Sequence, residues 1–129
     1  MVNTAEYETF PDDGEITKIE TVILRDHLGD NVKRWKESVN RFPKNVETRQ
    51  EKEDYLEHRL TDEVLVIYFD VNGAIYNNFF TIPKTQGGYN QSNLRKVKQL
   101  NKFPDKTEDW VGKKAKLILN DAGFPELEK

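Results

Sequence analysis

The pair Asn72-Gly73 is the feature that most restricts how this chain can fold. In EVLVIYFDVNGAIYNNFFTIP it stands between two runs of apolar, β-branched and aromatic residues. Asn and Gly both tolerate positive φ, which a two-residue type I′ turn requires. The sequence therefore predicts a tight antiparallel hairpin centred on this pair.

Side chains alternate between the two faces of a strand, so the turn also sets which residues share a face. One face is predicted to be the core, and the other, which carries Tyr68 and Phe79, to be half covered. Asn78 falls on the core face, and a bulge near Asn77-Asn78 would exchange Phe79 and Phe80, so the faces of these two rings stay open. The predicted core face holds Leu65, Ile67, Phe69 and Val71 from the first run, and Ala74, Tyr76, Asn78 and Phe80 from the second.

Downstream of the hairpin, the sequence predicts a loop, a short helix and a strand. The loop KTQGGYNQSN is rich in Gly and Asn, and Tyr89 is its one aromatic residue. Ser92 is a typical N-cap, and Leu94, Val97 and Leu100 recur at three-residue intervals, so we expect them to face inward. In the following strand, Ala115, Leu117 and Leu119 are expected on one face, and Lys114, Lys116 and Ile118 on the other.

Upstream of the hairpin, the pattern is less regular. GEITKIETVILRD over 14–26 mixes β-branched residues with imperfect alternation and is interpreted as a strand that ends at Gly29. NVKRWKESV over 31–39 is interpreted as a possible partner strand, joined by a turn at residues 28–30. NVETRQEKEDYLEHRL over 45–60 is dense in helix formers and nearly balanced in charge, which is typical of an exposed helix or a flexible insertion.

These elements favour one mostly β domain. A chain of 129 residues, 36% hydrophobic and 33% charged, can bury one modest core. The element order fits a small antiparallel OB-like barrel of five strands with one short helix between the third and fourth strands, and an open α+β sheet is the alternative. We expect an acidic N-terminal tail (1–13), a single domain (14–120) with a helical or flexible insertion at about 29–60, and a C-terminal tail (121–129).

The net charge of -3 conceals an uneven distribution. Residues 1–30 hold eight acids and two bases, a net charge of -6, whereas residues 84–116 hold nine bases and three acids, a net charge of +6. A basic segment of this kind attracts polyanions, although a run of charge is also typical of a solvated surface.

The C-terminal half resembles a known family. The hairpin ending in FFTIPK, the helix SNLRKVKQLNKF and the segment EDWVGKKAKLIL are similar to the small single-stranded-DNA-binding proteins that bacterial viruses encode beside their replication and recombination genes. Asp109, Gly112 and Lys113 match a D-x-x-G-K turn before a late barrel strand. The resemblance covers about residues 62–120, and residues 29–60 and the terminal AGFPELEK do not match. It implies an OB-type barrel that binds single-stranded DNA without sequence preference in viral DNA replication or recombination.

Binding of single strands combines cations along the phosphates with aromatic rings that stack on bases. The chain offers both kinds of residue, although core packing is the alternative role for each ring, above all for Trp35 and Phe79. The expected cations are Lys84, Arg95, Lys96, Lys98, Lys113, Lys114 and Lys116, and the expected rings are Trp35, Tyr68, Phe79 and Tyr89.

No enzymatic activity is predicted, and no cofactor or metal is expected. The two histidines, His27 and His58, have no metal-binding spacing, and the chain has no cysteine, glycine-rich phosphate loop or nucleophile elbow. The longest apolar run is far shorter than the roughly 20 residues that a membrane span needs. With no signal-peptide pattern at the N-terminus, we expect the cytoplasm, which for a viral protein is that of the host cell.

A protein-binding module that captures a host factor is the second hypothesis. Its basis is the acidic segment AEYETFPDDGE, in which Tyr7 and Phe10 are aromatic anchors among carboxylates. In a DNA-binding protein, the same segment would recruit replication or recombination proteins or cover the basic surface until DNA displaces it.

Overall fold

The computed structural model describes residues 12–90 and 92–129. Of the acidic tail expected over 1–13, only Asp12 and Asp13 therefore fall within the described residues. The chain divides into two compact units. We call Met1–Glu20 with Leu65–Lys129 the sheet unit and Thr21–Val64 the helical unit.

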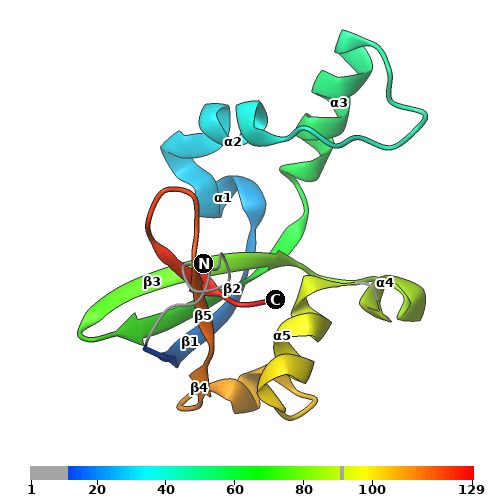
Figure 1. Ribbon diagram of the computed structural model, residues 1–129. Helices are drawn as coiled ribbons and strands as arrows, with labels where there is room; N and C mark the ends of the chain where they lie inside the picture. Colours follow the sequence, from blue (N-terminus) through cyan, green and yellow to red (C-terminus); the bar gives the residue numbers. More distant parts are fainter. Residues whose placement is uncertain (1–11, 91) are drawn as a thin grey trace, which may run out of the picture. The chain divides into compact units, whose positions relative to one another are not determined.

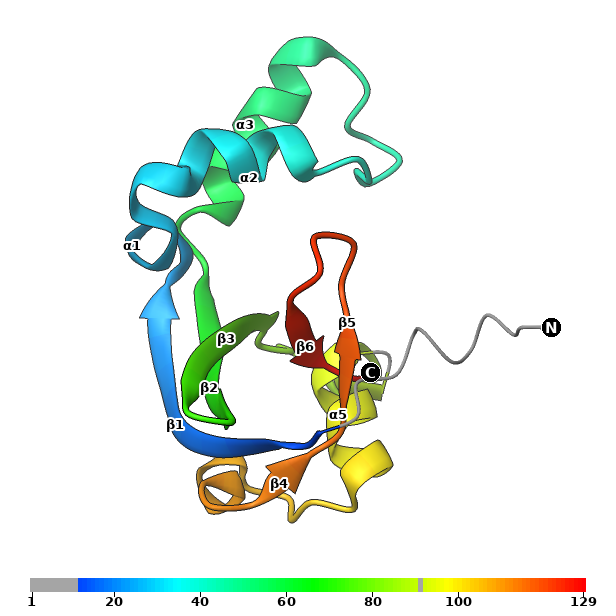
Figure 2. The same cartoon turned by 60° about the vertical axis from the view of Figure 1, so that its left-hand side comes forward.

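The fold is mixed α and β. Within the described residues the strands are β1 (Gly14–Ile23), β2 (Glu63–Val71), β3 (Ala74–Thr81), β4 (Lys114–Ala115), β5 (Leu117–Leu119) and β6 (Pro125–Leu127). Four of them form an antiparallel sheet in the order β3-β2-β1-β4, which curls into half a barrel (Figure 1, Figure 2). The other two, β5 and β6, pair with each other in antiparallel fashion.

The predicted hairpin is confirmed. Asn72 has φ 53° and Gly73 has φ 94°, the two positive values that a type I′ turn needs. The Asp70 side chain accepts a hydrogen bond of 2.8 Å from the Gly73 backbone N–H, which closes the turn.

The predicted inner face of the hairpin is confirmed for β2 and for Phe80, but not for Ala74, which is exposed beside the turn. On the face predicted to be half covered, Val64 and Val66 are fully buried. The β2 residues of that face are buried in one hydrophobic cluster, together with Phe80 from β3. Phe80 is 5% exposed and Phe79 only half-buried, which settles the open question of the two rings. The cluster includes Ile16, Leu65, Ile67, Phe69, Val71, Phe80, Leu94, Val97, Phe103, Trp110, Ala115, Leu117 and Leu127.

Asn78 has a structural role that explains its place on the core face. Its Oδ1 accepts a hydrogen bond of 2.8 Å from the backbone N–H of Leu127 in β6. The side chain thus joins β3 to β6, and the burial of Phe80 requires no bulge at Asn78. The C-terminal residues, expected as a tail, contain β6 because Pro125 and Leu127 are both buried.

A close approach between backbone and side chain brings β1 and β4 together. Gly14 pairs with Ala115 across the two strands, and both residues are buried. A Cβ atom at Gly14 would lie 2.8 Å from Cδ2 of Phe69, closer than packed atoms come. The position therefore requires glycine, and the small pair leaves room for the Phe69 ring.

Two helices follow the hairpin: α4 (Gln86–Asn90), where a loop was expected, and α5 (Asn93–Asn101). The Ser92 side chain caps α5 as predicted, by accepting a hydrogen bond from the Arg95 N–H, and Leu94 and Val97 are buried. The prediction for Leu100 is wrong, because its side chain is 38% exposed. Each helical residue turns by about 100°, so a strict three-residue interval drifts around the helix, and Asn101 takes the inward position instead. Its Oδ1 accepts a hydrogen bond of 2.9 Å from the Lys116 N–H.

This contact interrupts the strand predicted around Lys116. The structure has two short strands, β4 before Lys116 and β5 after it. Ala115 and Leu117 are buried as predicted, but Leu119 is 38% exposed and does not belong to the core. Before β4, the 3-10 helix η3 (Thr107–Trp110) buries Trp110, whose indole N–H donates to the Pro104 carbonyl at 2.7 Å.

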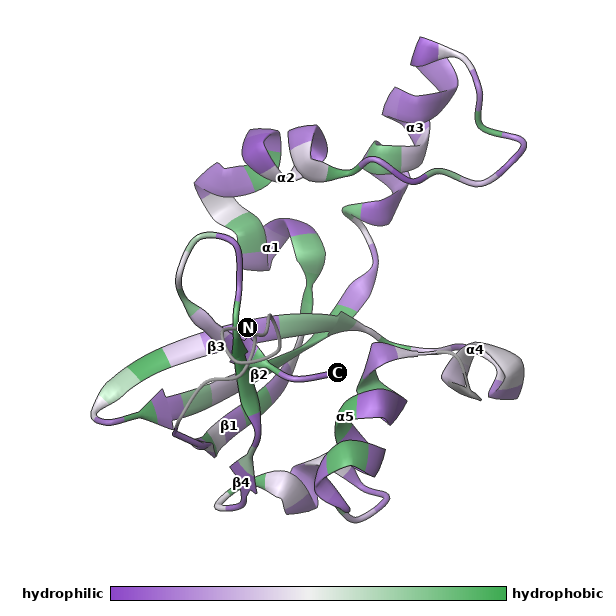
Figure 3. Cartoon of the chain, viewed as in Figure 1, coloured by the Kyte–Doolittle hydropathy of each residue, from purple (hydrophilic) through white to green (hydrophobic). Residues whose placement is uncertain are grey.

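The helical unit contains α1 (Leu24–Leu28), the 3-10 helix η2 (Gly29–Asn31), α2 (Val32–Ser38) and α3 (Arg49–Arg59). The interpretation of residues 31–39 as a strand is therefore wrong, since most of the segment is α2. Thr48 caps α3 in a reciprocal capping box with Glu51, a strong helix-start signal. Most residues of α3 are hydrophilic (Figure 3), and the unit buries Leu24, Leu56, Leu60 and Val64.

We expect the change Asn78→Ala to loosen β6 from β3. It leaves the Leu127 N–H without its acceptor, which costs about 1–3 kcal/mol when the group is buried. The free energy of unfolding in urea measures the loss. Asn77→Ala, on the exposed side of the same strand, is the matched control and should stay within about 0.5 kcal/mol of the parent. Equal stability of the two variants would contradict the role of Asn78.

Candidate nucleic-acid interface

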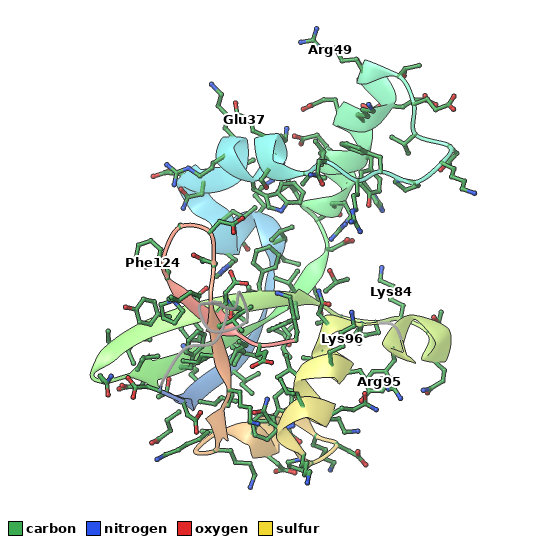
Figure 4. All side chains as sticks on the ribbon, viewed as in Figure 1. Glu37, Arg49, Lys84, Arg95, Lys96 and Phe124 are labelled. Atoms are coloured by element: carbon green, nitrogen blue, oxygen red, sulfur yellow. The ribbon has the colours of Figure 1, made fainter. Side chains whose placement is uncertain are left out.

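Three of the expected cations gather near the start of α5. Lys84 lies between β3 and α4, and Arg95 and Lys96 lie in the first turn of α5. Helices α4 and α5 contact each other, and all three side chains project from this part of the sheet unit (Figure 4). Lys84 and Lys96 are exposed and have no ion-pair partner among residues 12–90 and 92–129. The charge of these two lysines is therefore available to an anionic ligand.

Lys98 and Tyr89 are already bonded to neighbours. The Lys98 Nζ lies 2.5 Å from a carboxylate oxygen of Asp105 and donates to the Tyr89 hydroxyl at 3.2 Å. The same ammonium lies 5.7 Å from the centroid of the Tyr89 ring. A ligand would have to displace these contacts to reach either side chain, so the structure weakens both as binding residues.

The pairing shifts the titration of both groups. The hydrogen bond to Asp105, and then that to Tyr89, raises the pKa of Lys98 above 10.5, while the bond from Lys98 lowers the pKa of Asp105 below 3.8. The ion pair thus stabilises the fold above pH 3.8 and loses its effect as the pH falls through the lowered pKa of Asp105. At high pH the effect is lost as the pH rises through the raised pKa of Lys98. The Asp105 side chain is 91% exposed, so solvent screens most of this contribution.

The other expected lysines surround β4. Lys114 and Lys116 are exposed, as predicted from the alternation of the strand, and Lys113 before the strand is exposed too. Lys114 pairs in register with Glu15 of β1, so a carboxylate lies across the sheet from it. The backbone of Lys116 donates to Asn101 and accepts from the Glu128 N–H at 3.0 Å, while its side chain stays outside.

Tyr68 and Phe79 lie on the outer face of the β2–β3 hairpin, opposite the core side chains Phe69 and Phe80. Both rings are half-buried. The Nζ of Lys18 lies 5.4 Å from the centroid of the Tyr68 ring, and this places a cation beside an aromatic ring on the same face. Lys18 belongs to β1, and its Nζ also lies 3.4 Å from a carboxylate oxygen of Glu20, so part of its charge is already paired.

Sequence reasoning missed Lys18, although a signal was present. The alternation of β1 breaks where Thr17 and Lys18 are both exposed, after which Ile19 packs against the core. The Thr17 hydroxyl donates to the Tyr68 carbonyl at 3.5 Å, so Thr17 and Lys18 both contact Tyr68 of β2. An irregular strand with a lysine at the irregularity was the available signal for a cation on the outer face.

Trp35, the remaining expected ring, belongs to the helical unit. It lies on α2 and is half-buried, and its carbonyl accepts from the Ser38 hydroxyl at 2.6 Å. The rings of the sheet unit and Trp35 are thus in separate units of the chain.

Phe124 is an exposed ring that was not singled out from the sequence. It is 56% exposed and lies 6.5 Å, between ring centroids, from Tyr76, which stacks in turn on the buried Phe69 at 6.1 Å. The turn from 120 to 124 is tight because Asn120 Oδ1 accepts from the N–H groups of Ala122 and Phe124. Phe124 therefore projects outward from a well-bonded turn (Figure 4).

No metal site is found in the described part of the chain, where no three His, Asp or Glu side chains are arranged around a common point. Among the same residues, no helix has the length and apolar character needed to cross a membrane. In comparisons with known proteins, no family model, curated protein or solved structure matches this chain. What the chain does must therefore be inferred from its own residues.

We expect the change Lys98→Met to return the pKa of Asp105 toward its ordinary value of 3.8, because the hydrogen bond that lowers it is lost. A pH titration followed by carbon NMR of the side-chain carboxyl groups measures this pKa. Lys96→Met, on the same helix but without a bond to Asp105, is the control and should leave it lowered. An unchanged pKa in the Lys98 variant would show that the ion pair does not persist in solution.

Proposed function

We propose that the sheet unit is an OB-like barrel that binds single-stranded DNA without sequence preference. The order of its elements supports the fold. The antiparallel β1–β2–β3 sheet is followed by α5, the β4–β5 strand pairs with β1 at one end and with β6 at the other, and β6 contacts β3. This is the order of a five-stranded OB barrel in which β4 and β5 count as one bent strand and β6 is the last.

The observation that carries the proposal is the outer face of the β2–β3 hairpin. Tyr68 and Phe79 are large rings that the fold leaves only half-buried, and the ammonium of Lys18, which also pairs with Glu20 at 3.4 Å, lies beside the Tyr68 ring. In OB folds, the face of the second and third strands is a common binding surface for oligonucleotides. Unpaired bases stack on such rings whatever their sequence, because every base has a π face.

The exposed cations supply the attraction for the phosphates. Lys84 and Lys96 project near the start of α5, and Lys113, Lys114 and Lys116 surround β4. Contacts from cations to phosphates are independent of base sequence and weaken as salt rises. Together with the resemblance of residues 62–120 to viral single-stranded-DNA-binding proteins, they favour a role in viral DNA replication or recombination.

Protein binding is a second candidate, and Phe124 favours it. An exposed aromatic ring on a tight turn is a typical anchor for a protein partner. The neighbouring residues Asp121, Glu126 and Glu128 are acidic, which suits a basic partner better than a phosphate chain. This candidate predicts that Phe124→Ala abolishes binding to a protein partner and leaves DNA binding intact.

The direct test compares labelled single-stranded and duplex DNA by fluorescence anisotropy, at about 50 mM and about 200 mM salt. We expect the single strand to bind more tightly, with similar affinity for different sequences and with weaker binding at the higher salt. Equal or tighter binding of the duplex would rule out the proposal.

Tyr68 provides a test of stacking. We expect Tyr68→Leu to weaken binding of single strands by about 1–3 kcal/mol, the usual effect of losing one stacked ring. Tyr68→Phe keeps the ring and should bind like the parent protein. If the Leu and Phe variants bind equally, Tyr68 does not stack on a base.

Lys96 and Lys98 form a matched pair on α5, because each change to Gln removes one positive charge. We expect Lys96→Gln to reduce the slope of log affinity against log salt by about 0.7, the value for one phosphate contact on a single strand. Lys98→Gln should leave the slope unchanged, since Lys98 is bonded to Asp105. Equal slopes in the two variants would remove Lys96 from the interface.

A further inference from the structure

Charge in the helical unit is divided into paired and unpaired cations. The Lys36 ammonium bonds to Glu53 at 2.7 Å and also to Glu57, which accepts from Arg25 at 2.8 Å as well. These contacts link α1 and α2 to α3. They raise the pKa of Lys36 and lower that of Glu57, because each charge is hydrogen-bonded to its opposite. These cations are therefore used to hold the unit together.

Six other cations of the same unit are exposed and have no ion-pair partner among the described residues. Arg49 and Lys52 lie on α3. The remaining four are Lys33 and Arg34 on α2, and Arg41 and Lys44 in the connection to α3. All four lie in the twelve residues KRWKESVNRFPK, in which Glu37 is the one acid. We call Lys33, Arg34, Arg41 and Lys44 the α2 cations.

The stability of the fold does not account for the α2 cations. Exposed charges without partners contribute little to stability, and like charges close together repel each other. Acids are available on α3, but the structure pairs them with Lys36 and Arg25 instead. A cluster of unsatisfied positive charge is explained better by an anionic ligand than by folding.

The connection that carries Arg41 and Lys44 is anchored. The Phe42 ring meets Tyr55 of α3 edge-on at 5.6 Å between centroids, and Lys52 lies 5.3 Å from the centroid of the Phe42 ring. The Val46 N–H donates to the Pro43 carbonyl at 2.9 Å, which forms a turn around Lys44. The cations next to Phe42 are thus displayed from a segment with contacts of its own, which lowers the entropy lost when a ligand binds.

We propose that the α2 cations form a second polyanion-binding surface, which contacts the phosphates of a single-stranded nucleic acid. This inference rests on the function proposed for the sheet unit and assigns a separate binding surface to the helical unit. Trp35 and Phe42 are half-buried, so the surface offers charge more than stacking, and its contacts are independent of base sequence. A flexible phosphate chain can follow an irregular row of cations, whereas an acidic protein would need a matching shape.

The test uses the full chain and removes charge at two places in the helical unit. Lys33→Gln and Arg34→Gln, singly and as a pair, change the proposed surface, and Arg49→Gln changes α3, where Arg49 stands at the start of the helix (Figure 4). Binding to a labelled oligothymidylate is measured across a range of salt. We expect each single α2 variant to lose about 0.7 in salt slope and the α2 pair about 1.4, at roughly 0.7 per phosphate, and the α3 variant to lose none. If the lines of parent and variant meet at about 1 M salt, the α2 pair binds about 25-fold more weakly at about 0.1 M.

A second pair of changes, Arg41→Gln with Lys44→Gln, removes the rest of the α2 cations and should have a similar effect. Circular dichroism and the melting temperature check that each variant folds. Equal salt slopes in the α2 and α3 variants, with strong binding by the parent, would overturn this inference and leave the proposed function intact. No binding by the parent protein would overturn both.

Poly-L-glutamate of matched charge separates nucleic acid from an acidic protein as the ligand. We expect it to bind more weakly than the oligonucleotide. Equal affinity for poly-L-glutamate, lost in the same α2 variants, would assign the surface to an acidic protein and overturn the inference.

Discussion

The packing of Phe69 against Gly14 is the constraint on which the sheet unit depends. The ring is fully buried, and a Cβ at Gly14 would lie 2.8 Å from its Cδ2 atom. Only the small pair Gly14–Ala115 lets β1 and β4 meet over a ring of this size. That pairing in turn carries Lys113 and Lys114 to the outside of the unit. The outward position of these lysines is thus a consequence of core packing, because the burial of Ala115 determines which way its neighbours in the chain point.

The outer face of the hairpin follows from the same packing. Because Phe69 and Phe80 are drawn inward, strand alternation turns Tyr68 and Phe79 outward. The hydrogen bond that Asn78 accepts from the Leu127 N–H supports this register of Phe80, because it ties β3 to β6. Asn78, a polar residue on the core face, therefore affects the half-buried rings Tyr68 and Phe79 indirectly. With its side chain bonded to β6, the strand needs no bulge, and a bulge would exchange Phe79 and Phe80.

The sequence predicts those features that depend on local chemistry. The turn at Asn72-Gly73, the Ser92 cap and the inner face of β2 follow from φ preferences, capping and alternation within a few residues. Apart from Leu100, which fails through local helix periodicity, the features that failed depend on contacts between distant residues. Most of the segment 31–39 forms α2 although it was interpreted as a strand, and in that helix Lys36 bonds to Glu53 and Glu57. β6 forms because Asn78, 49 residues away, accepts a hydrogen bond from Leu127. Lys18 lies beside Tyr68 because the alternation of β1 is irregular there. Strand periodicity does not predict where such an irregularity places a side chain.

Net charge is a poor guide to which cations are available to a ligand, and the helices show why. On α5, Lys98 is bonded to Asp105 while Lys96 has no ion-pair partner within the described residues; on α2, Lys36 is bonded to α3 while Lys33 has none there either. On each helix, one lysine forms ion pairs that hold the fold together, while another lysine of the same helix faces solvent. A chain with net charge -3 can therefore carry surfaces of positive charge. Some of its acids form internal ion pairs, and others lie on other segments. Which cations are available to an anionic ligand is therefore decided by tertiary contacts.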